Sequence, residues 1–226
     1  GFQKLDTWLA KRVNGKLWAC MEATGRYGEN LAAHLYQAGY RVSVVNPARI
    51  KNYARSKLLR NKTDPLDAAL IADFCRSQET YEWLPPTEAE LTLKQLVNRL
   101  NSLVTDQTRE KNRLQAGELA GPVRASIEAH LAFLEEQIKW VSSQIQNHID
   151  QHPDLKTKQA LLETIPGIGK KTSAILLAEM PDPQHLSSKQ MAALAGLTPE
   201  QLSSGKYCRK QDKLSKVGRV SLRTAL

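Results

Sequence analysis

Apolar positions follow two different periods in the first third of the chain. Residues 2–12, 28–39 and 64–74 repeat apolar side chains at helical spacing, and the second of these segments closes on a glycine. Between them, residues 16–23 form a short apolar run and residues 40–47 a β-branched run that stops at a proline. The pattern predicts strands and helices in alternation, which is typical of an α/β sheet.

After the chain-breaking stretch WLPP (83–86), apolar residues recur in steps of three and four over two long segments. Such steps are typical of a coiled coil or a helical hairpin. Because the repeat covers only about three heptads, two core-facing helices in one globular body explain it equally well. LAGP (119–122) predicts the turn between them, and a helical pattern with short Gly/Pro loops resumes near Leu161. The apolar positions are Leu93, Leu96, Leu100 and Leu103, then Ile127, Leu131, Leu134, Ile138, Val141 and Ile145.

The 226 residues carry a formal net charge of +9, which favours polyanionic partners such as DNA, RNA or an anionic membrane. Residues 41–62 hold seven basic side chains and no acid, and residues 201–226 hold seven basic side chains and one acid. Residues 81–160 are nearly neutral, with nine basic and eleven acidic side chains. This distribution indicates two nucleic-acid surfaces, or one surface assembled from two domains.

Membrane and disulfide-rich classes find no support in the sequence. No apolar run is long enough to cross a bilayer, and there is no signal-peptide pattern. The cysteines, Cys20, Cys75 and Cys208, are far apart and lack zinc spacing, and the histidines do not cluster. We therefore expect reduced thiols in a cytoplasmic protein.

A pair of aspartates follows the basic stretch. Asp64 and Asp67 share one face of the predicted helix, and two like charges at that spacing repel unless a cation compensates them. Mg²⁺ suits this role because it takes few protein carboxylates and leaves places for phosphate oxygens. Alternatively, Asp64 caps the helix, with Pro65 at its first position and Asp67 in the first turn. Glu22 ends the strand predicted at 16–23, where open α/β sheets place functional groups, although an ordinary turn carboxylate is the simpler interpretation.

Two glycine-containing motifs lie further along the chain. IPGIGKKTSAILLAEM (165–180) lacks the phosphate-loop spacing, because Thr164 and Lys171 stand where glycine and a hydroxyl residue would be needed. It resembles a helix-hairpin-helix turn, in which the N–H groups of Gly167 to Gly169 hold one DNA phosphate, or it is a plain glycine turn. LSSGKYCRK (202–210) places two serines among cations that could stabilise a phosphate under attack, although a flexible turn is the favoured interpretation from these residues alone.

Five segments, taken in order, resemble the DEDD insertion-sequence transposases, the family of the Piv invertase and the bridge-RNA-guided recombinases. The resemblance spans nearly the whole chain and implies an α/β plus α fold. It implies a RuvC-like, RNase-H-type domain over 1–82, a helical hairpin or coiled-coil spacer over 83–158, and a mostly helical C-terminal transposase domain over 159–226 with the helix-hairpin-helix-like element. The segments are MEATGRYGENLAAHLYQAGYRVSVVNP, KTDPLDAALIADF, IPGIGKKTSAILLAEM, MAALAGLTP and SSGKYCRK…LSKVGR.

The resemblance also implies roles for individual residues. Glu22, Asp64 and Asp67 match the second, third and fourth acids of the DEDD set, which hold Mg²⁺ or Mn²⁺. Ser204 matches the serine that becomes linked to DNA, with Ser203 as the second choice. The first acid of the family normally lies in an N-terminal strand reading roughly GIDV, which is absent here. We therefore expect a truncated chain with an incomplete metal site.

The leading hypothesis is a DNA transposase or site-specific recombinase that cuts and rejoins duplex DNA. It would act as a dimer or tetramer in the bacterial cytoplasm, at the nucleoid, and a structured guide RNA is a further partner in some family members. A RuvC-like nuclease without a covalent intermediate and a non-catalytic nucleic-acid-binding module are the alternatives. The residues expected at nucleic acid are Arg49, Lys51, Arg55, Lys57, Arg60, Lys62, Gly167, Gly169, Lys170, Lys206, Arg209, Lys210, Lys213, Lys216 and Arg219.

Overall fold

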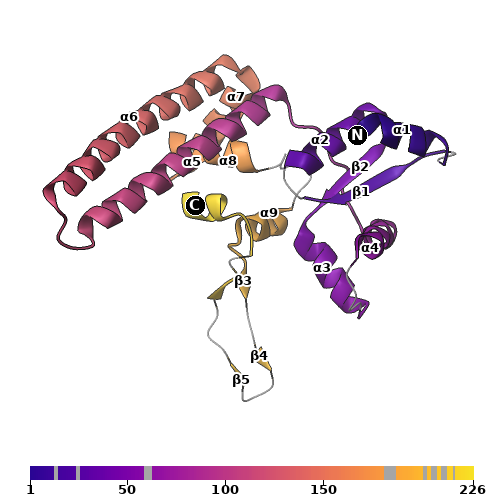
Figure 1. Cartoon of the computed structure of the whole chain (residues 1–226). Helices are drawn as coiled ribbons and strands as arrows, with labels where there is room; N and C mark the ends of the chain where they lie inside the picture. Colours follow the sequence, from indigo (N-terminus) through magenta and orange to yellow (C-terminus); the bar gives the residue numbers. More distant parts are fainter. Residues whose placement is uncertain are drawn as a thin grey trace. The chain divides into compact units, whose positions relative to one another are not determined.

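The computed structural model describes most of the chain as two compact units, residues 1–86 and 87–226 (Figure 1). Helices dominate a mixed α/β structure, in agreement with the coarse fold expected from the sequence. The division of the second unit into a spacer and a separate C-terminal domain stays a prediction. The described residues are 1–12, 15–23, 26–58, 63–180, 187–200, 203–204, 208–209, 213–215 and 217–226, with only the backbone described for 26, 27, 200, 203, 204, 208 and 209.

Two parallel strands form the centre of the first unit. Strand β1 (Trp18–Glu22) pairs with β2 (Arg41–Val45) in a register that runs from Trp18 opposite Arg41 to Glu22 opposite Val45. Helix α2 (Arg26–Gln37) makes the crossover that parallel strands require. Helix α1 (Phe2–Ala10) joins α2 and the strands in one apolar cluster, in which Ala32 and Val42 are fully buried.

Helices α3 (Pro47–Ser56) and α4 (Asp64–Ser77) close a second apolar cluster with the end of β2. The sequence pattern did not predict α3, because Pro47 was interpreted only as the end of a strand. Pro47 is instead the first residue of the helix, and the Asn46 side chain caps it by accepting a hydrogen bond from the Ala48 N–H at 2.8 Å. In α4 the N-cap is Thr63, so the suggestion that Asp64 is the cap is wrong by one residue.

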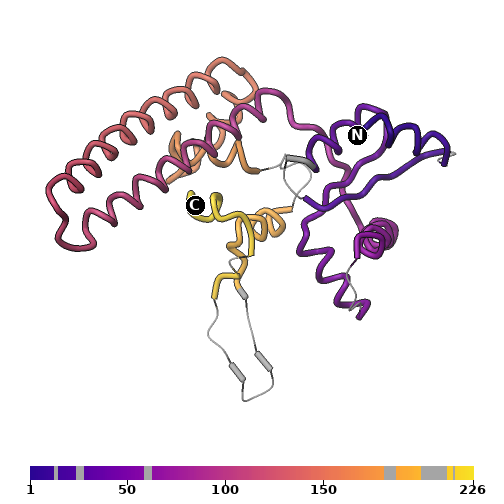
Figure 2. Tube along the Cα trace, in the orientation of Figure 1, coloured from indigo at the N-terminus to yellow at the C-terminus, as the bar shows by residue number. Residues whose placement is uncertain are grey.

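The second unit begins with a long helical hairpin, visible along the tube in Figure 2. Its helices are α5 (Glu88–Gln115), which opens with a Thr87–Glu90 capping box, and α6 (Gly121–Gln151). The apolar positions predicted from the three- and four-residue steps pack between them and continue into the core of the helices that follow. Near the turn, the buried carboxylate of Glu110 lies 3.3 Å from His130 Nδ1 on the facing helix. Because their apolar faces pack into one core, α5 and α6 are core-facing helices within this chain. A coiled coil between two chains stays a proposal.

Shorter helices and strands complete the second unit. The helices are α7 (Pro153–Glu163), α8 (Lys170–Glu179), α9 (Ser188–Ala195) and α10 (Val220–Ala225). Antiparallel pairing joins β3 (Pro199–Glu200) to β6 (Lys213–Leu214) and β4 (Ser203–Ser204) to β5 (Cys208–Arg209), strands that the sequence did not predict. Within the described parts of the chain, no helix combines the length and apolarity needed to cross a membrane.

The hairpin core yields a stability prediction. Leu93 is fully buried between α5 and its neighbours, whereas Leu161 on α7 is 70% exposed. Leu93→Ala should lower the free energy of unfolding by about 2–5 kcal/mol, because it removes buried methyl groups and leaves a cavity. Leu161→Ala, the matched control, should change it by less than about 0.5 kcal/mol. Chemical denaturation of both variants measures the difference, and equal effects would contradict the assigned packing.

Candidate active site

Glu22 lies at the carboxyl end of β1, beside a groove of about 460 Å³. One wall of the groove comes from β1 and α2, and the other comes from Ala68 and Ile71 of α4. The groove therefore faces the first two turns of the helix that carries both candidate aspartates. This is the edge at which open α/β sheets place their ligands.

Asp64 and Asp67 occupy the first turn of α4. Asp64 is exposed and Asp67 half-buried, next to the groove residue Ala68. In the described part of the chain, no hydrogen bond or ion pair engages the side chain of Asp64, Asp67 or Glu22. These three carboxylates, without partners among the residues described, are candidates for an external ligand, and the positive end of a helix favours anionic groups in its first turn.

Asp73, further along α4, has the opposite environment. Its carboxylate accepts a hydrogen bond from the Tyr53 hydroxyl at 2.7 Å and forms ion pairs with Lys57 and Arg76, each at 3.0 Å. Together with these two cations, the Tyr53 hydrogen bond holds the pKa of Asp73 well below its usual range. Because Tyr53 and Lys57 belong to α3 and its C-cap, this Asp73 clamp fixes α3 against α4. The sequence patterns gave no indication of this role.

The basic side chains of α3 divide into engaged and available groups. Lys57 is committed to Asp73, and the Arg49 guanidinium lies 5.1 Å from the centre of the Phe74 ring and donates to the Glu79 carbonyl at 3.1 Å. Lys51 and Arg55 are exposed, and no described residue engages their side chains. Arg60 and Lys62, also expected at nucleic acid, lie outside the described residues.

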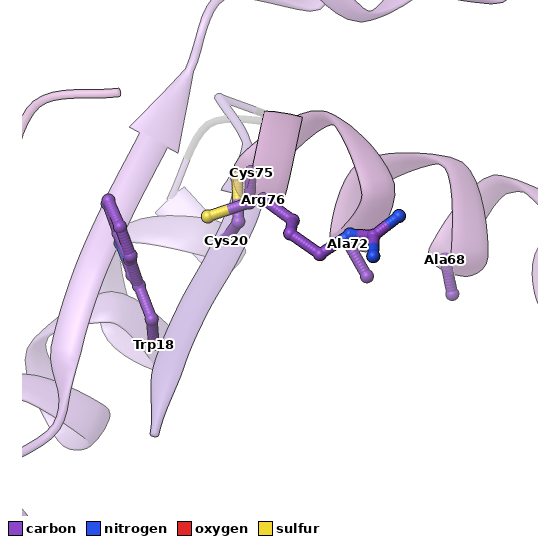
Figure 3. Close-up of a pocket in the computed structure, with 6 residues that line it drawn as sticks. All are labelled: Trp18, Cys20, Ala68, Ala72, Cys75 and Arg76. Carbon is purple, nitrogen blue, oxygen red and sulfur yellow. The ribbon is translucent and has the colours of Figure 1, made fainter. Parts of the chain in front are cut away.

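A smaller pocket of about 310 Å³ lies beside β1 and α4, where the side chains of Cys20 and Cys75 meet (Figure 3). Burial, together with the neighbouring Cys75, raises the pKa of Cys20 to about 12. The Cys20 thiol therefore stays protonated near neutral pH, which makes it a poor nucleophile and a poor metal ligand. These two thiols contribute packing between the strand and the helix.

The glycine turn between α7 and α8 is exposed. Gly167 has a φ of 93°, which favours glycine, and Gly169 is the N-cap of α8. A Cβ atom at either position would meet nothing within 4 Å, so there is open space beside both glycines. Between them, the Ile168 N–H already donates to the Ile165 carbonyl at 3.0 Å. Lys170 is the first residue of α8 and is also exposed. This arrangement can hold an anion, as expected for a phosphate.

Ser203 and Ser204 form β4, and the structure describes their backbone only. Lys206, Lys210 and Lys216 lie outside the described residues, and the side chain of Arg209 is likewise not described. Lys213 lies exposed in β6. The guanidinium of Arg219, which was expected at nucleic acid, contacts Glu179 of α8.

The donor chemistry of Glu22, Asp64 and Asp67 fits a divalent cation, which prefers carboxylate oxygens. Among the described residues, however, no three acidic, histidine or cysteine side chains gather as a metal-binding group. Mg²⁺ is commonly held by one or two carboxylates together with substrate phosphates, so these acids can supply part of a coordination shell but not a complete protein cage.

Comparison with known proteins decides the family. A family model described as Transposase, of the DEDD IS110 type, matches residues 1–117, and one described as Transposase IS116/IS110/IS902 family matches residues 159–226. Pilin gene-inverting proteins of Moraxella bovis and Moraxella lacunata are each 34% identical over 229 residues, covering 100% of this chain and 70% of the relative. The chain belongs to the IS110 family of transposases. This confirms the resemblance drawn from the five motifs.

As an IS110 transposase, the protein is a DNA transposase or recombinase, a class of enzyme that cuts DNA. Two features of its structure escaped the sequence patterns, the Asp73 clamp and the contact between Arg219 and Glu179. Spacing alone did not indicate the contact between α3 and Asp73 or the contact of Arg219, because Lys57 is 16 positions from Asp73 and Glu179 is 40 positions from Arg219.

The Asp73 clamp of the IS110 transposase predicts a pH dependence of stability. The clamp lowers the folded-state pKa of Asp73. Its contribution is therefore fully present above the unfolded-state pKa, about 3.9, and is lost as the pH falls through the lower folded-state value. Asp73→Asn should reduce the melting temperature at pH 7, and the difference from wild type should shrink below about pH 4.

The matched control for this variant is Asp64→Asn, a change of the same residue type on the same helix at a position without described partners. It should alter the melting temperature much less at pH 7. Melting curves recorded across the acid range test both statements. An Asp73→Asn difference that stays constant down to pH 2 would show that the ionised carboxylate is not the stabilising species.

Proposed function

We propose that this IS110 transposase cuts and rejoins duplex DNA through a covalent serine–DNA intermediate. Ser204 is the proposed nucleophile, and Glu22, Asp64 and Asp67 are the proposed acids beside the scissile phosphate. The observation that carries the proposal is the contrast among the acids of the first unit. Asp73 is saturated with internal partners, whereas the three acids matched by the family motif have none among the described residues. Glu22 lines a groove whose other wall comes from Ala68 and Ile71, on the helix that carries both aspartates.

The topology of the first unit supports a RuvC-like, RNase-H-type assignment. Two parallel strands joined by α2 place Glu22 at a strand end, and α4, which carries Asp67, contributes Ala68 and Ile71 to the same groove. Family membership over residues 1–117 supports the same assignment. Under this proposal the three acids are the second, third and fourth members of the DEDD set.

The proposed serine step conserves the number of phosphoester bonds. The Ser204 hydroxyl gives up its proton as its Oγ bonds to phosphorus, and one P–O bond of the DNA backbone breaks. The leaving oxygen takes a proton and becomes a free DNA hydroxyl. Attack by a DNA hydroxyl on the serine phosphoester reverses these changes and rejoins a strand without an external energy source. Nearby cations would stabilise the charge that develops on the phosphate.

Glu22, Asp64 and Asp67 would hold a Mg²⁺ or Mn²⁺ ion together with phosphate oxygens. When bound, such an ion supplies Lewis-acid polarisation of the phosphate. The protein's own contribution is to present Glu22 in the groove and two aspartates on the helix that forms its other wall, all without partners among the described residues. The Asp73 clamp keeps this acid-bearing helix and the basic helix α3 in fixed relation.

The acids lie in the first unit and the serine in the second, so the reaction requires both units at one phosphate. We infer that a dimer or tetramer provides this arrangement, with the helical hairpin as a contact between copies. Lys51 and Arg55 on α3 are available to a nucleic-acid backbone, including that of a structured guide RNA. The relatives are named for inverting a pilin gene, and we propose that this protein likewise rearranges DNA, at the bacterial nucleoid.

The serine assignment is tested in the full-length protein with duplex DNA that carries its recombination site. Ser204→Ala should abolish the covalent protein–DNA adduct seen on denaturing gels, because no other group takes its place. Ser203→Ala is the matched control and should keep the adduct. An adduct that persists in Ser204→Ala overturns the assignment, and cleavage without any adduct in the wild type would favour a hydrolytic nuclease.

The acid assignment predicts dependence on both the carboxylates and a divalent ion. Glu22→Gln and Asp67→Asn should each reduce DNA cleavage at least about a hundredfold, in line with the loss of a group that stabilises the transition state. Glu118→Gln, an exposed acid in the hairpin turn, is the control and should cleave normally. Excess chelator should stop cleavage by the wild type, and full cleavage in its presence would contradict the proposal.

A further inference from the structure

Ser203 and Ser204 form β4, which pairs with β5, and the pair β3–β6 flanks them in the sequence. We name residues 199–214 the serine arm. At its base, β3 pairs with β6, with Pro199 opposite Leu214. The Ser215 N–H extends this pairing by donating to the Thr198 carbonyl at 2.9 Å. Both ends of the serine arm therefore emerge together beside the end of α9.

A contact between two glycines holds the two ends of the serine arm. Gly196 ends α9 in the left-handed conformation, with a φ of 70°. The backbone at Gly218 passes so close that a Cβ atom there would lie 2.4 Å from Gly196 N and 2.6 Å from the Leu194 carbonyl oxygen. Real Cβ atoms do not approach backbone atoms this closely, so position 218 requires glycine for this packing.

Arg219, the residue after Gly218, connects the end of α9 to helices α8 and α10. Its backbone N–H donates to the Leu194 carbonyl at 2.7 Å, at the end of α9, and the residue itself is the N-cap of α10. Its guanidinium lies 3.1 Å from the Glu179 carboxylate and also donates to the Glu179 backbone carbonyl, at the end of α8. A cation at this position complements the negative end of the α8 dipole.

The environment of Glu179 indicates that this contact is structural. The Glu179 side chain is only 12% exposed, and a carboxylate so far removed from water requires a charged or hydrogen-bonded partner. Arg219 supplies that partner, because its Nη1 donates one hydrogen bond to the carboxylate and another to the Glu179 backbone carbonyl. A guanidinium engaged in this way has less capacity to serve as a DNA phosphate ligand.

We propose that Gly196, Gly218, Arg219 and Glu179 form an arm anchor that orients the serine arm for attack on DNA. Arg219 is thereby a positioning residue that acts through the serine. This role replaces the contact with a DNA phosphate that was expected of it from the sequence. This inference rests on the proposed function, because it assigns Ser204 of the arm as the nucleophile. It extends that function by assigning to the arm anchor the task of setting the direction from which Ser204 approaches the DNA phosphate.

The first experiment separates positioning from DNA contact in the full-length protein. Arg219→Gln, Arg219→Lys and Glu179→Gln should each lower the single-turnover rate of adduct formation at saturating DNA by tenfold or more. Both contacts come from a single guanidinium nitrogen, Nη1. Lysine should fail like glutamine, because it keeps the charge but its shorter side chain does not carry a nitrogen to the position of Nη1. The dissociation constant for DNA, and its dependence on salt, should stay unchanged in all three.

A phosphate contact would give a different pattern. Arg219→Gln would then weaken DNA binding and reduce the salt slope by about one, Arg219→Lys would retain binding, and Glu179→Gln would leave the rate unchanged because it frees the guanidinium. That pattern overturns the arm anchor. Melting temperatures of the three variants distinguish a local effect from loss of the folded unit.

Gly218→Ala tests the backbone contact without changing any charge. It should lower the adduct rate at least tenfold, leave DNA affinity unchanged, and remove hydrogen-exchange protection from the Ser215 and Arg219 amides. Gly121→Ala, at a glycine with open space around it, is the matched control and should preserve rate and protection. A wild-type rate in Gly218→Ala overturns the proposal.

Failure of the arm anchor and failure of the proposed function give different results. If Ser204→Ala still forms the adduct, the assignment of the nucleophile is wrong, and amide protection in Gly218→Ala still reports whether the anchor holds the arm. If Ser204→Ala abolishes the adduct while Gly218→Ala and Arg219→Gln react at the wild-type rate, only the arm anchor is wrong.

Discussion

The carboxylate of Asp73 is the point on which the arrangement of the acid-bearing helix depends. A phenol hydroxyl and two cations converge on it, and two of these three donors come from α3 and its C-cap. Without a covalent restraint between neighbouring helices, their relative orientation depends on packing and on such polar contacts. The apolar contact of Phe74 with Tyr53 supplies the packing, with ring centres 5.3 Å apart. The charged cluster adds direction, because charge-assisted hydrogen bonds are short and oriented.

This constraint explains why acids on a single helix can serve opposite purposes. Asp64 and Asp67 lie in the first turn of α4, where the helix dipole stabilises their charges and no described side chain pairs with them. Asp73 lies in the third turn and finds cations that neutralise it locally. The helix thus presents unpartnered acids at the groove end and a saturated acid at the end that packs on α3. The two units also use different means, since the second fixes the serine arm through backbone contact at Gly196 and Gly218.

Sequence periodicity predicted the helices and strands that bury one face and leave the other exposed. The strands at 18–22 and 41–45, and the helices at 26–37 and 64–77, each bury one face or a short apolar run, so their patterns are readable. Helix α3 was missed because its start depends on one capping asparagine and a proline, which also match the end of a strand. The two-residue strands of the serine arm are too short to show any period. Motif order indicated the family, whereas the partners that reach Asp73 from α3, and the partner of Arg219, depend on side-chain geometry that no spacing rule contains.

Net charge alone overstates the surface available to nucleic acid, and the basic helix α3 shows why. Lys57 neutralises Asp73, and Arg49 is held over an aromatic ring and at a carbonyl group. Binding of a phosphate to an already paired cation must first break the internal pair, so it gains less than binding to a free cation. Under the proposed function, Lys51 and Arg55, the cations of α3 without described partners, would therefore contribute more to counterion release than Arg49 and Lys57. The basic stretch thus serves two purposes, because part of its charge holds the acid-bearing helix in place and the remainder is available to nucleic acid.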